Sequence, residues 1–346
     1  MNARWRHRPE GSTWGDFGPD DELGRLNLLT PERVLSGVRE VQTGRTFCLS
    51  LPLDYPGGNV LNPRRFPPRL RATMRPGLAS YNLPMETIEP NQVDVLCDDA
   101  ALIYLQYSTQ WDSFAHCGAM FDADGDGVPE PLYYNGFRAG VDIVGPPPGE
   151  RDGQPNLEPV EARALGIEKM AAHGVQGRGV LVDLHAHHGR ARAWIGYDEL
   201  MRAIEADRVT VEPGDMLCLH TGFAQLLLDL KRAPDKETLD TSCAVLDGRD
   251  DRLLRWITDS QISVLIGDNY AVEGLPSRTT PKGRHPGLPL HHHCLFKLGV
   301  HLGEMFYLTE LARWLRANGR SRFLLTAPPL RLPGAVGSPS TAIATV

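Results

Sequence analysis

The segment 104–116 concentrates side chains that could bind a metal ion or carry a proton. If a strand runs through it, the period of two places Gln106, Gln110 and Asp112 on one face. If the chain coils after Asp112, His116 follows on the same face at the i, i+4 spacing. Carboxylate, amide oxygen and imidazole ligands suit zinc or manganese. A solvated strand edge without a metal explains this segment by itself equally well.

The segment 288–304 holds a second group of candidate ligands. Three consecutive histidines, His291, His292 and His293, point in three directions around a helix, so at most one or two can face a common site. We expect Glu304 to begin the last helix, where the helix dipole also favours a carboxylate. Taken alone, Glu304 is more simply interpreted as a first-turn acid without a ligand role.

Short apolar runs and helix signals predict the elements that position these residues. Buried strands are expected where apolar runs are bounded by turn residues, at 101–107, 179–184, 215–220 and 262–267. Helices are expected from Pro31 toward Gly44, and over 197–206 and 304–317. Interleaved strands and helices predict an α/β protein with a mixed sheet and long functional loops. We predict one domain over residues 1–346, with an N-terminal extension of about residues 1–45.

Composition excludes several classes of function. The 346 residues carry a net charge of -7 and no stripe of Lys and Arg, which disfavours nucleic acid as a partner. No stretch reaches the roughly 18 apolar residues of a membrane span, and the first residues do not form an export signal. The six cysteines form no C-x-x-C pair, which is typical of reduced thiols in a cytoplasmic protein.

Two other polar segments contain residue patterns similar to those of metal sites. The segment 122–127 begins like a calcium loop, but Tyr133 stands where the final Glu is needed, so we expect a polar surface turn. Asp183, His185 and His187 follow an apolar run and would share one strand face, although a solvated strand end explains them better.

The motif around Asp112 resembles the signature of the cyclase-like metal hydrolases, the family of bacterial kynurenine formamidase and isatin hydrolase. That signature reads H-x-G-T-H-x-D-x-P-x-H; Thr109, Asp112 and His116 match it, while Gln106 and Gln110 replace its first two histidines and Phe114 replaces its proline. A branch of the family reads T-Q-W-D-x-x-x-H, which residues 109–116 fit throughout. Further similar segments span most of the chain: Trp14-Gly15, Asn27-Leu28, Tyr134-Asn135-Gly136, residues 214–222, Asp268-Asn269 and Gly303-Glu304.

The resemblance implies a swivelling β/β/α cyclase-like fold, a homo-oligomer (dimer or tetramer) and one or two divalent ions, zinc or manganese. It implies that Asp112 and Glu304 are metal ligands and that Gln110 stands at a ligand position. The later ligand is either His291 or His292, depending on which flank is used for alignment. The last motif residue, His116, would be the catalytic base.

The implied reaction is hydrolysis of a C–N or C–O bond in a small molecule, with Gln106, Tyr134 and His220 as candidate substrate contacts. We expect a cyclic or acyl amide to be opened by metal-activated water. A lactone hydrolase with the same machinery is the alternative. The glutamines also leave open a metal-free binding protein of the same fold, because an amide oxygen is a weaker donor than imidazole. Where a metal is bound, the same replacement favours manganese over zinc.

Overall fold

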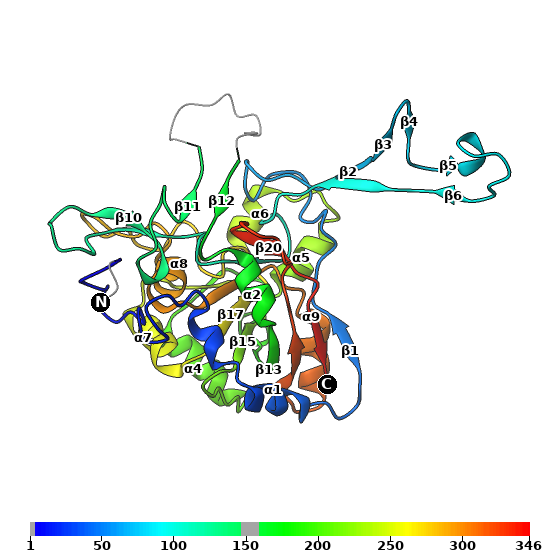
Figure 1. The fold of residues 1–346 in the computed structure, drawn as a ribbon. Coiled ribbons are helices and arrows are strands. Elements are labelled where there is room, and N and C mark those ends of the chain that lie inside the picture. The colour runs from blue at the N-terminus through cyan, green and yellow to red at the C-terminus, as the bar shows by residue number, and fades with distance from the viewer. Residues whose placement is uncertain (1–3, 147–158) are drawn as a thin grey trace.

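A mixed sheet lies at the centre of the fold. The computed structural model describes residues 4–146 and 159–346, and within them this sheet has nine strands (Figure 1). The four central strands, β13, β15, β17 and β18, run parallel, and the pairs toward both edges run antiparallel. In spatial order the strands are β1 (Thr46–Cys48), β21 (Ile343–Thr345), β19 (Arg322–Thr326), β13 (Gln176–Val182), β15 (Met216–Leu219), β17 (Val264–Gly267), β18 (His301–Glu304), β8 (Gln110–Asp112) and β20 (Gly337–Pro339).

Helices cover both faces of this sheet, as expected for parallel strands that are buried on both sides. On β15, Leu217 and Leu219 join one core, whereas Met216 and Cys218 join the other. The first core includes side chains of α4, α7 and a π-helix, and the second includes side chains of α2 and α9. The helices are α1 (Pro31–Val38), α2 (Ile167–His173), α3 (Leu184–His188), α4 (Tyr197–Ala206), α5 (Phe223–Asp229), α6 (Lys236–Thr241), α7 (Asp251–Ser260), α8 (Pro289–His291), the π-helix (His292–Leu298) and α9 (Thr309–Ala317).

The predicted α/β architecture with a mixed sheet is confirmed. The apolar runs at 179–184, 215–220 and 262–267 correspond to β13, β15 and β17, and the helix predicted over 197–206 is α4. The first helix begins at Pro31 as predicted but ends at Val38, before Gly44. The single domain with an N-terminal extension stays a prediction, although Trp14 of that segment is fully buried and donates a hydrogen bond to the Phe296 carbonyl.

Three predicted elements are wrong. The strand at 101–107 is not buried and does not continue: β7 (Asp99–Leu102) is exposed, and the chain then turns before β8. Glu304 does not begin a helix, because it ends β18 in register with Gln110, and α9 starts only at Thr309. The helix dipole therefore does not act on Glu304. Asp183 caps the short helix α3 instead of ending a strand with His185 and His187 on one face.

Smaller two-stranded pairs accompany the main sheet. The longest series begins with β2 (Arg69–Ala72) paired with β7 and continues outward, projecting well away from the sheet (Figure 1). Its further pairs are β3 (Met74–Arg75) with β4 (Leu78–Ala79) and β5 (Leu83–Pro84) with β6 (Val95–Leu96). The remaining pairs are β9 (Ala119–Phe121) with β10 (Glu130–Leu132), β11 (Ile143–Val144) with β12 (Glu161–Ala162), and β14 (Ala193–Ile195) with β16 (Ala244–Leu246). No helix among the described residues is long and apolar enough to cross a membrane.

Candidate metal centre

Strands β8 and β18 bring the polar residues of the two motifs together. Glu304 pairs directly with Gln110, and Leu302 pairs with Asp112. Because side chains two residues apart share a strand face, Gln110, Asp112 and Glu304 all project from the same side of the sheet. All three are buried. The residue between the two ligand positions of β8, Trp111, packs into the opposite core and donates its Nε1 hydrogen to the Ala327 carbonyl.

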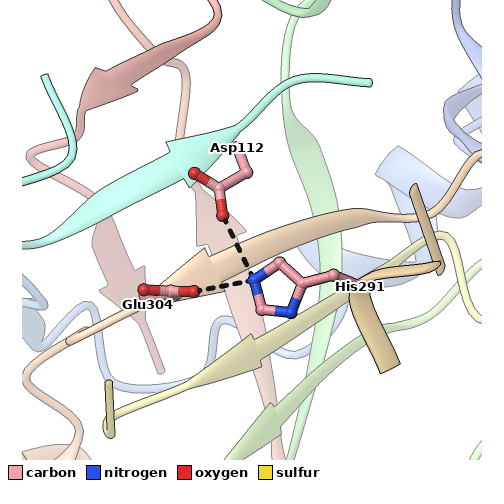
Figure 2. A group of neighbouring side chains, drawn as sticks. All are labelled: Asp112, His291 and Glu304. Carbon is pink, nitrogen blue, oxygen red and sulfur yellow. Dashed lines mark ion pairs between the residues drawn. The ribbon is translucent and has the colours of Figure 1, made fainter. Parts of the chain in front are cut away.

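The third candidate ligand comes from α8, where His291 reaches over this face of the sheet. Its Nε2 lies 3.3 Å from Glu304 Oε1 and 3.9 Å from Asp112 Oδ2, and Figure 2 shows the ring directed at both carboxylates. The potential ligand atoms of Asp112, His291 and Glu304 all lie within 4.8 Å of one another. Hereafter these three residues are called the carboxylate–histidine cluster.

Glu273 fixes the orientation of His291. One of its oxygens lies 2.8 Å from His291 Nδ1, and the same carboxylate accepts hydrogen bonds from the backbone amides of Leu290 and His291. A carboxylate on one ring nitrogen leaves the other nitrogen aimed at the site and increases its basicity as a ligand. Glu273 was not predicted from the sequence. The only sequence feature that could have indicated its role is that it is a single acid between Val272 and Gly274, in the loop that follows β17.

Gln110 bridges the two carboxylates of the cluster. Its Nε2 lies 3.3 Å from Asp112 Oδ1 and 3.2 Å from Glu304 Oε2. Its own carbonyl oxygen Oε1 is buried and has no hydrogen-bond partner among the described residues, and the same is true of Asp112 Oδ2. Buried polar atoms are rarely left without a partner, because each such atom costs about 1–3 kcal/mol. A cation between these residues would satisfy both oxygens once the Gln110 amide is turned over.

The electrostatics of the cluster require a positive charge. Burial raises the pKa of Asp112, and the nearby Glu304 raises it further against the influence of His116. Burial alone would lower the pKa of His291, but hydrogen bonds to Glu273 and Glu304 raise it to about 10. A proton on His291 therefore balances part of the charge of three buried carboxylates. A divalent cation would supply that charge more fully, and oxygen and imidazole donors are the ligands that zinc and manganese accept. These residues fit such an ion.

His116 lies at the edge of the cluster. Its Nε2 is 3.9 Å from Asp112 Oδ1, and 22% of its side chain is exposed, whereas the Asp112 side chain is completely buried. The chain turns sharply after Asp112, with the amide of His116 donating to the Ser113 carbonyl. The predicted i, i+4 proximity of Asp112 and His116 is confirmed. A histidine that lies beside Asp112 and is also exposed to solvent is suitably placed to transfer a proton.

The structure places the other predicted site residues outside the cluster. Gln106 lies in the turn before β8, not on its face, and its backbone carbonyl accepts a hydrogen bond from Arg65. Tyr134 is fully buried against Phe114. His220 is held between Asp183 Oδ1 at 2.7 Å and Thr309 Oγ1 at 3.1 Å. The proposed contacts of Gln106, Tyr134 and His220 with a substrate stay predictions.

The two histidines after His291 have different surroundings. His292 packs against Phe296, and His293 Nε2 lies 2.9 Å from Thr258 Oγ1. Burial lowers the pKa of both rings to about 4. Neither belongs to the carboxylate–histidine cluster. Of the two alternatives left open by the sequence, the geometry therefore favours His291 as the ligand.

A cleft of about 610 Å³ is lined by residues that are sequence neighbours of His116 and His291. Its lining includes Cys117, which follows His116, and His292, which follows His291. Arg284, His285 and Met120 complete much of its wall. The cleft is large enough for a small molecule, because ligand pockets typically enclose about 300–1,000 Å³.

The polar turn at 122–127 forms the second acid cluster among the described residues. Asp122, Asp124 and Asp126 could approach a cation, but Asp122 accepts hydrogen bonds from the amides of Gly125 and Gly127. Asp124 and Asp126 accept further backbone hydrogen bonds two residues ahead. The turn is thus stabilised by its own backbone, in agreement with the interpretation from the sequence.

Comparison with known proteins places this site in a family. A family model described as "Putative cyclase" matches residues 70–274, which is more than half of the chain. The chain belongs to the cyclase family. The resemblance inferred from the motif is thereby confirmed. No curated protein sequence matches the chain.

Solved structures agree with membership of the cyclase family. The crystal structure of a novel cyclase is 30% identical to this chain, covers 97% of both chains and superposes with a TM-score of 0.72. Isatin hydrolase A from Ralstonia solanacearum is 12% identical, covers 87% of this chain and 91% of its own, and gives a TM-score of 0.53. Isatin hydrolase A from Labrenzia aggregata, bound to benzyl benzoate, is 13% identical, covers 87% and 93%, and gives 0.52. The two isatin hydrolases share the fold, and the novel cyclase is similar over nearly its whole length.

Replacing one carboxylate of the cluster tests its role as a ligand. We expect Asp112→Asn to contain less than half of the zinc or manganese that the wild-type protein binds. The variant removes a negative charge without changing the shape of the side chain. Elemental analysis of protein purified without chelator measures this. Asp124→Asn, in the polar turn at 122–127, is the matched control and should keep its metal. Full occupancy in Asp112→Asn would remove Asp112 from the ligands.

Replacing Gln110 tests whether its side chain reaches the ion. An imidazole between Asp112 and Glu304 should raise the affinity for zinc relative to manganese, because nitrogen is the softer donor. We therefore expect Gln110→His to shift a zinc–manganese competition toward zinc. Gln42→His, which adds the same ring at an exposed position between α1 and β1, should leave the ratio of zinc to manganese unchanged. The same ratio of bound zinc to manganese in both variants would contradict direct ligation by Gln110.

Proposed function

We propose that this member of the cyclase family is a metal-dependent hydrolase that opens a cyclic or acyl amide bond in a small molecule. The observation that carries the proposal is the convergence of Asp112, Glu304 and His291, with their ligand atoms within 4.8 Å of one another, in a buried and strongly acidic site. Two buried carboxylates without a compensating charge are costly, so such a site favours the binding of a cation. The hydrolase names among the similar structures support the same class of reaction.

Each residue of the site would have a separate role. Asp112, Glu304 and His291, with Gln110, would hold a zinc or manganese ion. When bound, such an ion polarises a carbonyl group and lowers the pKa of water. Glu273 keeps His291 Nε2 directed at the carboxylates of Asp112 and Glu304 through its contact with Nδ1. The cleft lined by Cys117 and His292 would admit the substrate to the His116 side of the cluster.

His116 would handle the proton of the reaction. Hydrolysis forms a bond between the water oxygen and the acyl carbon, breaks the C–N bond and needs a proton on the departing nitrogen. His116 Nε2 would accept a proton from water and return it to that nitrogen, which would leave as an amine while the acyl group becomes an acid. Its partial exposure allows the ring to approach both water and substrate.

A lactone hydrolase is the alternative, because the same residues could direct water at an ester carbonyl. The two reactions differ in the leaving group: an amine nitrogen must be protonated to leave, whereas an alkoxide oxygen is less demanding. Turnover of N-formylkynurenine, isatin and simple lactones by the wild-type protein distinguishes the two activities. A protein that turns over none of them and contains no metal would instead be a binding protein of this fold.

The variant His116→Ala tests the assigned base. We expect it to keep its metal and to lose roughly 10²- to 10⁴-fold in kcat on an amide substrate, which is the usual contribution of a positioned acid–base group. The loss should be smaller on a lactone of similar shape. His187→Ala, which removes a histidine paired with Asp207 elsewhere on the molecule, is the control and should keep full activity. Loss of metal from His116→Ala would make His116 a ligand, and unchanged turnover would exclude it as the base.

A further inference from the structure

One arginine near the carboxylate–histidine cluster, Arg65, has no role in the mechanism described above. Its Nη1 donates a hydrogen bond of 2.7 Å to the backbone carbonyl of Gln106, in the turn before β8. The side chain of Gln106 lies against Gly337, where an added Cβ would be 2.5 Å from Gln106 Nε2. Gly337 is the partner of Asp112 in the pairing of β20 with β8. A short series of contacts therefore links Arg65 to Asp112.

The charge of Arg65 acts on both carboxylates of the cluster. Burial raises the pKa of Asp112, and Arg65 is among the charged groups that oppose this rise. Burial also acts to raise the pKa of Glu304, but His291 and then Arg65 hold that pKa below its ordinary value. Arg65 nevertheless forms no ion pair with any acid that the structure describes. Its charge is thus available to a ligand that enters the site.

The guanidinium of Arg65 has donors that the described residues do not use. The hydrogen bond to Gln106 occupies Nη1. Neither Nε nor Nη2 has a hydrogen-bond partner in the described part of the chain, and neither belongs to the buried polar atoms that lack one. These two nitrogens are therefore accessible to solvent. Side by side, Nε and Nη2 form a fork that matches the two oxygens of a carboxylate.

The loop that carries Arg65 is anchored by two tyrosines. The hydroxyl of Tyr107, just before β8, accepts a hydrogen bond from the amide of Gly57. The hydroxyl of Tyr270, between β17 and β18, accepts one from the Asn62 side chain at 3.2 Å. The backbone amide of Arg65 donates to the Asn62 carbonyl. A side chain on an anchored loop loses less freedom when it binds a ligand, which favours affinity.

We propose that Arg65 binds a carboxylate of the substrate through its Nε and Nη2, so that the molecule cleaved at this site is an amide with a carboxylate near the scissile bond. This inference rests on the proposed function, because it takes the carboxylate–histidine cluster as the reacting centre. The cluster would hold the amide, and Arg65 would hold the acid group. A phosphate group fits less well, because the buried acids would repel its second negative charge more strongly.

Two simpler roles for Arg65 lead to different expectations. If Arg65 only fixed the turn through the Gln106 carbonyl, its loss would affect an acid and its neutral analogue equally. The same holds if Arg65 only balanced the charge of the buried carboxylates. Recognition of a carboxylate instead distinguishes an acid from a neutral molecule of the same shape.

Calorimetric titration of the metal-loaded protein with benzoate and with benzamide tests this recognition without turnover. We expect Arg65→Gln to weaken benzoate binding roughly 10- to 100-fold, which is the usual contribution of a hydrogen bond to a charged group. Binding of benzamide should be the same as in the wild type. Arg65→Lys keeps the charge but not the fork, so it should recover only part of the affinity. Arg64→Gln, the same change at the exposed neighbouring residue, is the matched control and should bind benzoate like the wild type.

Two aryl formamides test the same recognition in turnover, because 2-formamidobenzoate carries a carboxylate and formanilide does not. In Arg65→Gln the KM for 2-formamidobenzoate should rise roughly 10- to 100-fold. The kcat should change by less than about threefold, because the contact is made equally in the ground state and the transition state. Both constants for formanilide should stay at their wild-type values.

Metal content and circular dichroism of each variant should equal those of the wild type, which separates recognition from folding and from metal binding. Wild-type protein that binds no benzoate at millimolar concentration, Arg65→Gln that binds it normally, or equal losses on the acid and the neutral formamide would each overturn the proposal. A protein that cleaves neither formamide, but whose benzoate binding depends on Arg65, would instead overturn the amide-hydrolase function and leave the carboxylate site established.

Discussion

Two carboxylates buried on the same face of adjacent strands are the constraint on which the site depends. Asp112 and Glu304 cannot both stay ionised away from water unless a positive charge lies between them. Much of the surrounding structure serves this requirement. His291 brings a nitrogen to both acids, Glu273 orients that nitrogen, and Gln110 bridges the two carboxylates. A proton on His291 meets the requirement partly, and a divalent cation meets it more completely.

The sheet supplies the rigidity that this arrangement needs. Strand β8 lies between β18 and β20, and backbone hydrogen bonds to both neighbours fix Gln110 and Asp112 in place. The hydroxyl of Thr109 donates to the Met305 carbonyl, and His301 Nδ1 lies 2.9 Å from the Asp112 carbonyl while its ring stacks on Phe114. The motif thus contains two kinds of residue: Gln110, Asp112 and His116 face the site, whereas Thr109 and Trp111 hold the strand in place.

The α/β class and the elements β13, β15, β17 and α4 could be predicted from the sequence. The resemblance to the family also predicted that Asp112 and Glu304 belong to one site. Local patterns could not show that Glu304 ends a strand, because its pairing with Gln110 joins residues 194 positions apart. Which of the three histidines faces the carboxylates depends on the helix register, which changes where α8 meets the π-helix. Glu273 was missed because a single loop acid has no periodicity. The run at 101–107 was assigned to the core because its apolar residues alone do not show whether a strand is buried or lies in an exposed ribbon.

The central claim is that a divalent cation is bound between Asp112, His291 and Glu304. Anomalous X-ray diffraction from crystals of protein purified without chelator tests it most directly, with data collected on both sides of the zinc and manganese absorption edges. We expect one strong anomalous peak within bonding distance of His291 Nε2 and of an oxygen from each carboxylate, with the Gln110 amide turned so that Oε1 faces it. A His291 ring hydrogen-bonded directly to Glu304 with no anomalous peak between them, or a peak only at the turn of Asp122, Asp124 and Asp126, would contradict the claim.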